Sequence, residues 1–239
     1  MKIVILCAGK GRRMLINYPK SLLKINTKHS ILKNIYKNFT KHGIKNKDII
    51  FATGYKPELI KKEIGNKINC IHNKKYASTN MVYTLMNTVK KIDDDVIITY
   101  SDIVYDLKNV KKILKSKSQF ITFVDKKWKK LWKTKNKLES DSETLKIKKD
   151  IILELGKKTR NINSVHARYV GLTKISKENL DIIKNIYFNK LKINREKFLK
   201  IDMTNFFNFL IQNKFKLNYL QLIGNWDEFD DEEDYKNYL

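Results

Sequence analysis

A glycine-rich turn near the start of the chain is followed by two cationic side chains. Gly9 and Gly11 come directly after the apolar run of residues 2–7, which predicts a buried strand that ends in a tight turn. Such a turn presents backbone N–H groups that can cradle a phosphate. Arg13 can hold a polyphosphate through paired hydrogen bonds, and Lys20 can place a point charge on a phosphoryl group. These residue types predict phosphoryl chemistry, although two glycines after a strand also occur in ordinary turns.

The turn differs from two common phosphate-binding loops. Met14 stands where a dinucleotide-binding loop has its third glycine. The Gly-Lys-Ser or Gly-Lys-Thr ending of a P-loop is missing as well. The sequence therefore predicts a nucleotide-handling loop of another kind, in which Ala8, Gly9 and Gly11 contact the nucleotide.

Asp102 is the strongest candidate for a metal ligand. It lies just past the carboxyl end of the apolar run 95–100, where open α/β sheets bind their ligands. Mg²⁺ binds to a few carboxylates and keeps several waters, so one or two such residues suffice. A turn or capping role is the alternative for Asp102. Asp202 precedes a predicted helix and can be its N-cap.

Other metal and nucleophile patterns are missing from the sequence. The histidines are isolated, and Cys7 and Cys70 lack the spacing of zinc ligands. The two cysteines are expected to be free thiols in a reducing compartment. The histidines are His29, His42, His72 and His166.

Three polar residues follow the third predicted strand. The amides of Asn73 and Asn80 and the hydroxyl of Thr79 offer the donors and acceptors that reading a pyrimidine edge requires. Thr79 or Asn80 can also cap the helix that follows, and the two roles are compatible.

The segment 125–137 is a dense basic cluster that contains two tryptophans. Trp128 and Trp132 stand four residues apart and would share one face of a helix. Aromatics among lysines can stack on single-stranded nucleic acid, cover a small ligand or pack into the core. If the cluster adjoins a ligand site, its lysines should disfavour a cationic ligand such as choline.

Strand and helix patterns alternate through the first half of the chain. Such alternation predicts a Rossmann-like, doubly wound mixed α/β sheet with helices on both faces. Residues 128–170 are expected to form shorter strands, and the acidic C-terminal end is expected to be largely solvated. Expected strands are 2–7, 48–53, 68–72, 95–100, 119–124 and 215–223, and expected helices are 30–43, 57–65, 80–92, 107–116, 176–190 and 203–213.

The composition is that of a folded but strongly basic chain. Its 239 residues are 42% hydrophobic and 11% aromatic, which suffices for a sizeable core. The formal net charge of +25 raises the hypothesis of nucleic-acid binding, but lysines spread along the whole chain favour compositional drift. No membrane insertion and a cytoplasmic location are expected, because no long apolar run or secretory signal is found.

Five segments together resemble the sugar-phosphate nucleotidyltransferase superfamily. The pattern of residues 9–13 and the Pro-Lys-x-Leu-Leu of 19–23 are similar to its signature. Residues 73–87 resemble its phosphocholine and phosphonate cytidylyltransferase branch. Residues 95–106 are similar to the strand that delivers the metal-binding Asp, and 224–235 to the closing Trp-x-Glu-x-Asp element. The resemblance covers nearly the whole chain.

The resemblance implies a Mg²⁺-dependent enzyme that moves CMP from CTP to a phosphorylated or phosphonate small molecule and releases pyrophosphate. The product would be a CDP-activated precursor for decorating a surface polysaccharide or lipid. A single domain, 1–239, would hold a nucleotide-binding half (1–120) and an acceptor-binding half (121–239). Arg13 would stabilise the leaving pyrophosphate, and Lys20 would hold the reacting phosphates.

The resemblance also implies ligands and acceptor contacts beyond the loop. Asp202 would be the second metal ligand beside Asp102, with Asp227 or Asp230 as alternatives. Asn205, where relatives often have Asp, leaves that ligand open. Trp128, Tyr169, Asp227 and Asp230 are the predicted acceptor contacts.

Two other functions compete with this prediction. One is a sugar-1-phosphate nucleotidyltransferase that uses UTP or dTTP, and the other is a basic nucleic-acid-binding protein. The predicted partners are CTP and the acceptor, without nucleic acid, and the oligomeric state is open, with a homodimer as one option.

Overall fold

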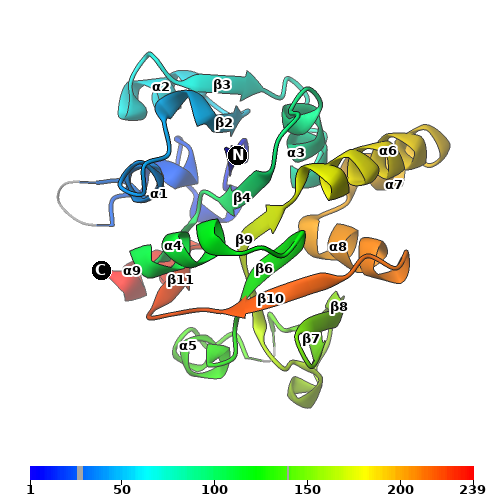
Figure 1. Cartoon of the computed structure of the whole chain (residues 1–239). Coiled ribbons are helices and arrows are strands. Elements are labelled where there is room, and N and C mark those ends of the chain that lie inside the picture. Colours follow the sequence, from blue (N-terminus) through cyan, green and yellow to red (C-terminus); the bar gives the residue numbers. More distant parts are fainter. Residues whose placement is uncertain (26–28, 139) are drawn as a thin grey trace.

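A computed structural model describes residues 1–25, 29–138 and 140–239 (Figure 1). In these residues a nine-stranded sheet runs in the order β3-β2-β1-β4-β9-β6-β10-β8-β7, and a two-stranded sheet pairs β11 with β5. The strands are β1 (Lys2–Cys7), β2 (Ile49–Thr53), β3 (Asn69–His72), β4 (Val96–Tyr100), β5 (Ile103–Tyr105), β6 (Phe120–Asp125), β7 (Glu143–Lys148), β8 (Ile151–Lys158), β9 (Arg168–Ile175), β10 (Leu217–Gln221) and β11 (Trp226–Glu228). The α-helices are α1 (Ile31–Thr40), α2 (Pro57–Ile64), α3 (Met81–Val89), α4 (Leu107–Lys115), α5 (Trp128–Thr134), α6 (Lys177–Ile193), α7 (Arg195–Lys200), α8 (Met203–Gln212) and α9 (Glu232–Tyr238).

The first four strands form a parallel unit. β1 lies between β2 and β4 and is parallel to both, and β2 is parallel to β3. Because parallel strands end at the same edge of the sheet, the segments after β1 and β4 meet there. This arrangement brings the glycine turn and Asp102 to one edge, as the strand-helix alternation predicted.

The second half extends the same sheet with mixed pairing. β9 is antiparallel to both β4 and β6, and β10 is parallel to β6. β8 and β7 continue the sheet as an antiparallel pair beside β10. The predicted doubly wound mixed α/β fold is therefore confirmed.

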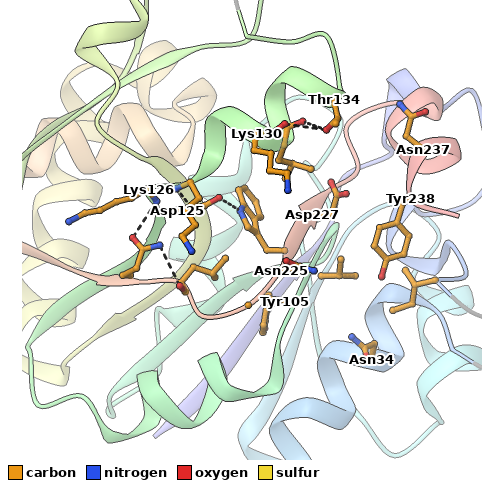
Figure 2. A pocket seen from close by; sticks show the side chains of 18 residues that line it. Asn34, Tyr105, Asp125, Lys126, Lys130, Thr134, Asn225, Asp227, Asn237 and Tyr238 are labelled. Atoms are coloured by element: carbon orange, nitrogen blue, oxygen red, sulfur yellow. Dashed lines mark hydrogen bonds between the residues drawn. The ribbon is translucent and has the colours of Figure 1, made fainter.

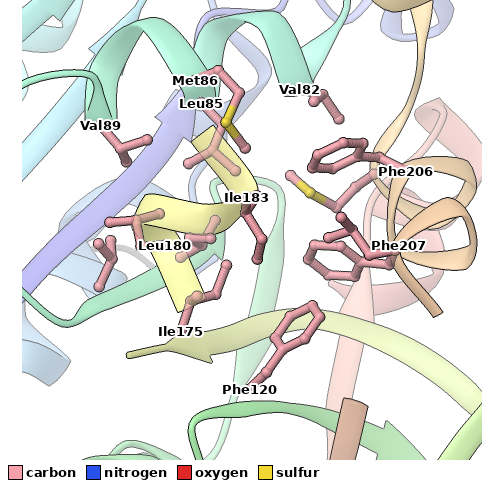
Figure 3. Close-up of a cluster of buried hydrophobic side chains, with 14 of the residues drawn as sticks. Val82, Leu85, Met86, Val89, Phe120, Ile175, Leu180, Ile183, Phe206 and Phe207 are labelled. Carbon is pink, nitrogen blue, oxygen red and sulfur yellow. The ribbon is translucent and has the colours of Figure 1, made fainter. Parts of the chain in front are cut away.

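Each face of the sheet is covered by its own set of helices. Alternate residues of β1 enter different clusters: Val4 and Leu6 pack on one face, and Ile3 and Ile5 on the other. The first cluster is covered by α3, α6 and α8, whose apolar side chains converge in Figure 3. Within it Phe120 and Phe207 meet edge to face at 5.2 Å. The second cluster includes residues of α1, α4 and α5.

Two segments differ from the predicted pattern. Residues 128–134 form the helix α5 instead of a strand, because the four-residue spacing of Trp128 and Trp132 buries both rings on one helical face. The C-terminal end forms α9, in which Glu232 and Glu233 are exposed but Asp234 is only 2% exposed. Asp234 is stabilised there by Lys137, whose Nζ lies 2.7 Å from its Oδ1.

Two further expectations concern the thiols and the membrane. Cys7 is buried and Cys70 is half-buried, and both are free. Among the described residues no helix is long and apolar enough to cross a bilayer.

Candidate active site

The glycine turn takes its shape from two left-handed residues. Gly11 has φ 68° and Leu15 has φ 50°, on either side of a single 3-10 turn, Arg12–Met14. A Cβ atom on Gly11 would lie 2.9 Å from the Cβ of Lys20, so only glycine fits without displacing that side chain. Met14 is 2% exposed and anchors the turn in the core at the position of the missing third glycine.

Lys20 sits at the centre of the site. It begins a second 3-10 turn, Lys20–Leu22, directly after Pro19. Its Nζ lies 2.6 Å from Oδ2 of Asp102 and 3.9 Å from Oδ1 of Asp230. Burial alone would lower the pKa of Lys20, but attraction to Asp102 and a hydrogen bond with it outweigh burial, so the pKa lies above its usual value. Lys20 is therefore a fixed positive charge between two carboxylates.

Arg13 approaches the same carboxylates from the solvent side. Its Nη2 donates to Oδ1 of Asp230 over 2.8 Å, and 66% of its side chain is exposed. The C-terminal segment is tied to the end of β4, because Phe229 N donates to the carbonyl oxygen of Asp102. This hydrogen bond thus connects the segment after β4 with the segment after β11, which lie far apart in the sequence.

A cavity of about 220 Å³, here called the loop cavity, opens beside the glycine turn. Ser21 is a member that the sequence reasoning missed: it is 3% exposed, and its hydroxyl has no hydrogen-bond partner among the described residues. A buried hydroxyl without a partner is costly, so a ligand that completes its hydrogen bonding is favoured. The predicted residues that line this cavity are Ala8, Gly9, Gly11, Lys20, Thr79, Asn80 and Asp102.

Asn73 does not line the loop cavity but supports its wall. Its Nδ2 donates to Oγ1 of Thr79 (3.0 Å) and of Thr84 (2.9 Å), and its Oδ1 accepts from Lys75 N. Asn80 caps α3, since its Oδ1 accepts from Met81 N. The capping interpretation of Asn80 is thus confirmed, and Asn73 lies one layer behind the cavity that it was predicted to contact.

A second cavity, of about 340 Å³ and here called the strand cavity, adjoins the first. The two share Lys20, Met81, Tyr100 and Asp102 in their walls. Of the predicted residues, Arg13, Tyr169, Asp202 and Asp230 also line the strand cavity.

The predicted residues of the strand cavity are held by other protein groups. Tyr169 packs edge-on against Tyr100 at 5.9 Å, and burial raises the pKa of Tyr169 to about 12. Asp202 caps α8: its Oδ1 accepts from Asn205 N (2.8 Å) and its Oδ2 from Asn205 Nδ2 (2.8 Å).

Arg168 gives the strand cavity a rigid cation that the sequence reasoning did not identify. Its Nη1 and Nη2 donate to the carbonyl oxygen and to Oδ2 of Asp141, over 2.6 and 2.8 Å. Its guanidinium also lies over the Trp132 ring, 4.1 Å from the centroid. Shorter strands were expected within 128–170, but no local sequence pattern connects Arg168 with Asp141.

Carboxyl groups outnumber cations in the wall of the strand cavity. Glu228 is half-buried there, and burial together with the nearby Asp230 and Asp102 raises its pKa to about 8, against the lowering effect of Arg168 and Lys20. Among the described residues of this wall the cations are Arg13, Lys20 and Arg168, and the carboxylates are Asp102, Asp141, Glu143, Asp202, Glu228 and Asp230.

Trp128 and Asp227 lie outside both cavities, contrary to their predicted acceptor contacts. Trp128 is 1% exposed and packs against Trp132 in the core. Asp227 pairs with Lys135 over 2.5 Å, and its strand neighbour Glu228 faces the strand cavity instead. Consecutive residues of an extended chain face opposite sides, and residues two apart face the same side. Because Asp230 lines the strand cavity, Glu228 is expected to line it too, whereas Asp227 is expected to face away.

The carboxylates do not form a ready-made metal cage. Among the described residues no group of three or more His, Cys, Asp or Glu side chains is arranged to hold a metal ion. Asp102 and Asp230 nevertheless both approach Lys20, so two oxygen ligands and a cation lie where the cavities meet. This junction can bind phosphate groups and neutralise their charge.

Comparison with known proteins gives one full-length relative. A CTP:phosphoglutamine cytidylyltransferase of Campylobacter jejuni is 33% identical over 247 aligned residues, which cover 96% of each chain. No family model matches the chain.

Solved structures share the fold at low sequence identity. A putative glucose-1-phosphate thymidylyltransferase of Bacillus anthracis superposes with a TM-score of 0.77 at 14% identity, over 100% of this chain and 93% of its own. A CTP:phosphocholine cytidylyltransferase of Streptococcus pneumoniae superposes with a TM-score of 0.72 at 18% identity, over 99% and 96%. These likenesses concern the fold alone.

Proposed function

Because the chain belongs to the sugar-phosphate nucleotidyltransferase superfamily, in its cytidylyltransferase branch, we propose that it transfers CMP from CTP to a phosphorylated small molecule and releases pyrophosphate. The observation that carries this proposal is Lys20, which joins the loop cavity to the strand cavity. A nucleotide in the first and an acceptor in the second would bring their phosphates together at its Nζ.

The reaction needs positioning more than proton transfer. An oxygen of the acceptor phosphate attacks the α-phosphorus of CTP, a new P–O bond forms, and the bond to the β-phosphate oxygen breaks with its electron pair leaving on pyrophosphate. The attacking oxygen is already anionic, so no general base is required. Lys20 holds the reacting phosphates, and Arg13 releases Asp230 to stabilise the departing pyrophosphate.

Mg²⁺ fits the chemistry of this junction and would be held by Asp102 and a second carboxylate. When bound, it neutralises phosphate charge and polarises the P–O bonds. Asp230 suits the second position better than Asp202, because Asp230 shares Lys20 with Asp102. Both oxygens of Asp202 already accept hydrogen bonds from Asn205 at the start of α8.

The acceptor is expected to carry an ammonium group as well as its phosphate. The lysines of segment 125–137 do not line the strand cavity, whose wall holds more carboxylates than cations. A cationic acceptor is therefore favoured, because the lysines that would repel it lie outside this cavity. Arg168 offers a fixed partner for a carboxylate, so an amino-acid phosphate of the phosphoglutamine kind fits best. The product would be a CDP-activated precursor for decorating a surface polymer or lipid.

The experiment that tests this function follows pyrophosphate release with CTP, UTP, dTTP and ATP against phosphoglutamine, phosphocholine and glycerol phosphate. CTP with phosphoglutamine should give the highest kcat/KM. Lys20→Ala should reduce turnover by about a thousandfold or more, in the range known for a lost transition-state contact, with the circular dichroism spectrum unchanged. Near wild-type turnover in that variant would show that the site is assigned wrongly, and preference for UTP or dTTP would favour a sugar-1-phosphate nucleotidyltransferase.

A further inference from the structure

A third cavity, of about 1170 Å³ and here called the lysine cavity, lies outside the reaction site. Its wall is built from α5, the connection between β10 and β11, and the end of α9 (Figure 2). Strand β11 separates it from the strand cavity, since Asp227 faces the lysine cavity and the next residue, Glu228, faces the strand cavity. The proposed reaction uses none of the residues that line the lysine cavity.

Two lysines, one on helix α5 and one just before it, line this space. Burial of Trp128 and Trp132 on one face of α5 leaves Lys130 exposed on the other, and Lys127 precedes the first turn. Figure 2 shows the side chain of Lys130 reaching from α5 toward the open centre of the cavity. The ammonium groups of Lys127 and Lys130 have no hydrogen bond or ion pair with another described residue.

The carboxylates of the same wall are already neutralised or hydrogen-bonded. Asp125 accepts from the Trp226 indole Nε1 over 2.9 Å and from the backbone N of Lys127 over 2.7 Å. Asp227 pairs with Lys135 at 2.5 Å. Asp125 keeps its negative charge, because both of its donors are neutral. The wall also holds three lysines, Lys126, Lys127 and Lys130, so positive charge is left over and an anion would satisfy it.

The remaining wall suits the uncharged part of such an anion. Asn34, Asn225 and Asn237 offer amide donors and acceptors, and Tyr105 and Tyr238 add aromatic surface. The volume exceeds that of a bare phosphate and lies just above the roughly 300–1,000 Å³ of ordinary small-molecule sites, so a nucleotide-sized molecule has room. A concave wall of this size suits a small soluble molecule better than a flat membrane surface.

We propose that the lysine cavity is a second ligand site, which binds a soluble phosphate-bearing small molecule through Lys127 and Lys130. Lysine ammonium groups bind phosphate as point charges, so the affinity rests on charge and on the depth of the cavity. This proposal does not depend on the proposed transfer reaction.

Titration calorimetry with inorganic tripolyphosphate tests the site, with CTP at saturation to occupy the loop cavity. The double variant Lys127→Gln/Lys130→Gln removes the two free ammonium groups. The matched control Lys129→Gln/Lys133→Gln removes the same charge from exposed positions of α5 that do not line the cavity. Both variants should unfold at the wild-type temperature, since all four side chains are exposed.

Tripolyphosphate should bind the wild type, and its Kd should rise about tenfold in the first variant and less than about twofold in the control. Hydrogen exchange should slow in residues 125–134 and 221–227 on binding. The comparison remains valid even if CTP does not bind, because both variants leave the loop cavity intact. Equal weakening in the two variants would assign binding to bulk charge and overturn the proposal, as would absence of binding to the wild type.

Discussion

Ser21 lies next to Lys20 on the wall of the loop cavity, and its hydroxyl lacks a hydrogen-bond partner among the described residues. Ser21→Ala should raise the KM for CTP about five- to tenfold, because it removes one hydrogen bond of about 1 kcal/mol to the nucleotide. The free energy of unfolding should hardly change. Ser101→Ala is the contrast: its hydroxyl donates to the Leu6 carbonyl over 2.7 Å, so its loss should destabilise the fold. An unchanged KM for CTP in Ser21→Ala would show that the Ser21 hydroxyl does not bind the nucleotide.

The second carboxylate of the junction can be identified by two matched substitutions. Asp230→Asn should raise the Mg²⁺ concentration needed for half-maximal turnover by about tenfold or more, because it removes one of two charged ligands. Asp202→Asn should shift that concentration little but destabilise the fold by about 1 kcal/mol, since asparagine caps a helix nearly as well while the pairing with Asn205 is weakened. Magnesium titrations of turnover measure the first effect and urea unfolding the second. The reverse pattern would restore Asp202 as the ligand.

The location of some site residues could be predicted from the sequence, while their chemical roles stay predictions. Gly11 and Asp102 were selected because they follow predicted buried strands, and Lys20 because its charge suits a phosphoryl group; all three line the loop cavity. Ser21 was missed because serine is common in turns. The lack of a hydrogen-bond partner for its hydroxyl is visible only in the three-dimensional structure. Arg168 was missed because its partner Asp141 lies 27 positions away in the sequence.

Strand β11 separates the lysine cavity from the strand cavity. Its residue Asp227 faces the first and its residue Glu228 the second. At pH 9, above the raised pKa of about 8 of Glu228, Glu228→Gln should raise the KM for the acceptor several-fold and leave the KM for CTP unchanged, because it removes a negative charge from the strand cavity alone. At pH 7, where Glu228 is mostly protonated, the substitution should change either KM little. Asp227→Asn is the matched control. It should leave both KM values unchanged and destabilise the fold by about 1 kcal/mol, since Lys135 loses its 2.5 Å partner but keeps Asp234 at 3.4 Å and the carbonyl oxygen of Glu228.

Steady-state kinetics with each substrate varied and denaturant unfolding of both variants give the four values. If Asp227→Asn raised the acceptor KM and Glu228→Gln did not, the orientation of β11 would be the opposite of that described. The sequence placed the acidic segment near the site but did not resolve which side each residue faces. That orientation is set by the pairing of Glu228 with Ile103, which fixes the register against β5.

Elements with a strong apolar pattern were predicted within a few residues, whereas α5 was not. β1 and β2 are buried along their length, so their apolar runs are continuous and unambiguous. α5 has seven residues, too few for a helical period to stand out from a lysine-rich background. Its position is fixed by tertiary packing of Trp132 on Trp226, at 5.8 Å between ring centroids.

The charge of the whole molecule is the last feature with a measurable consequence. The chain carries 50 Lys and Arg against 25 Asp and Glu, so most surface cations repel one another at low salt. Raising NaCl from about 0.02 to about 0.5 M should therefore raise the thermal midpoint by several degrees, because screening weakens this repulsion. The ion pairs around Lys20 and Lys135 are largely buried and should be little affected.

Differential scanning calorimetry across this salt series measures the shift. Sodium sulfate also strengthens the burial of apolar surface, so chloride is the salt to use. Succinylation of exposed lysines to bring the net charge near zero provides the control, and should flatten the dependence on chloride. A midpoint that falls with chloride in the unmodified protein would mean that surface ion pairs outweigh the excess charge. The charged side chains would then form ion-pair networks whose stabilising effect exceeds the repulsion from the +25 net charge.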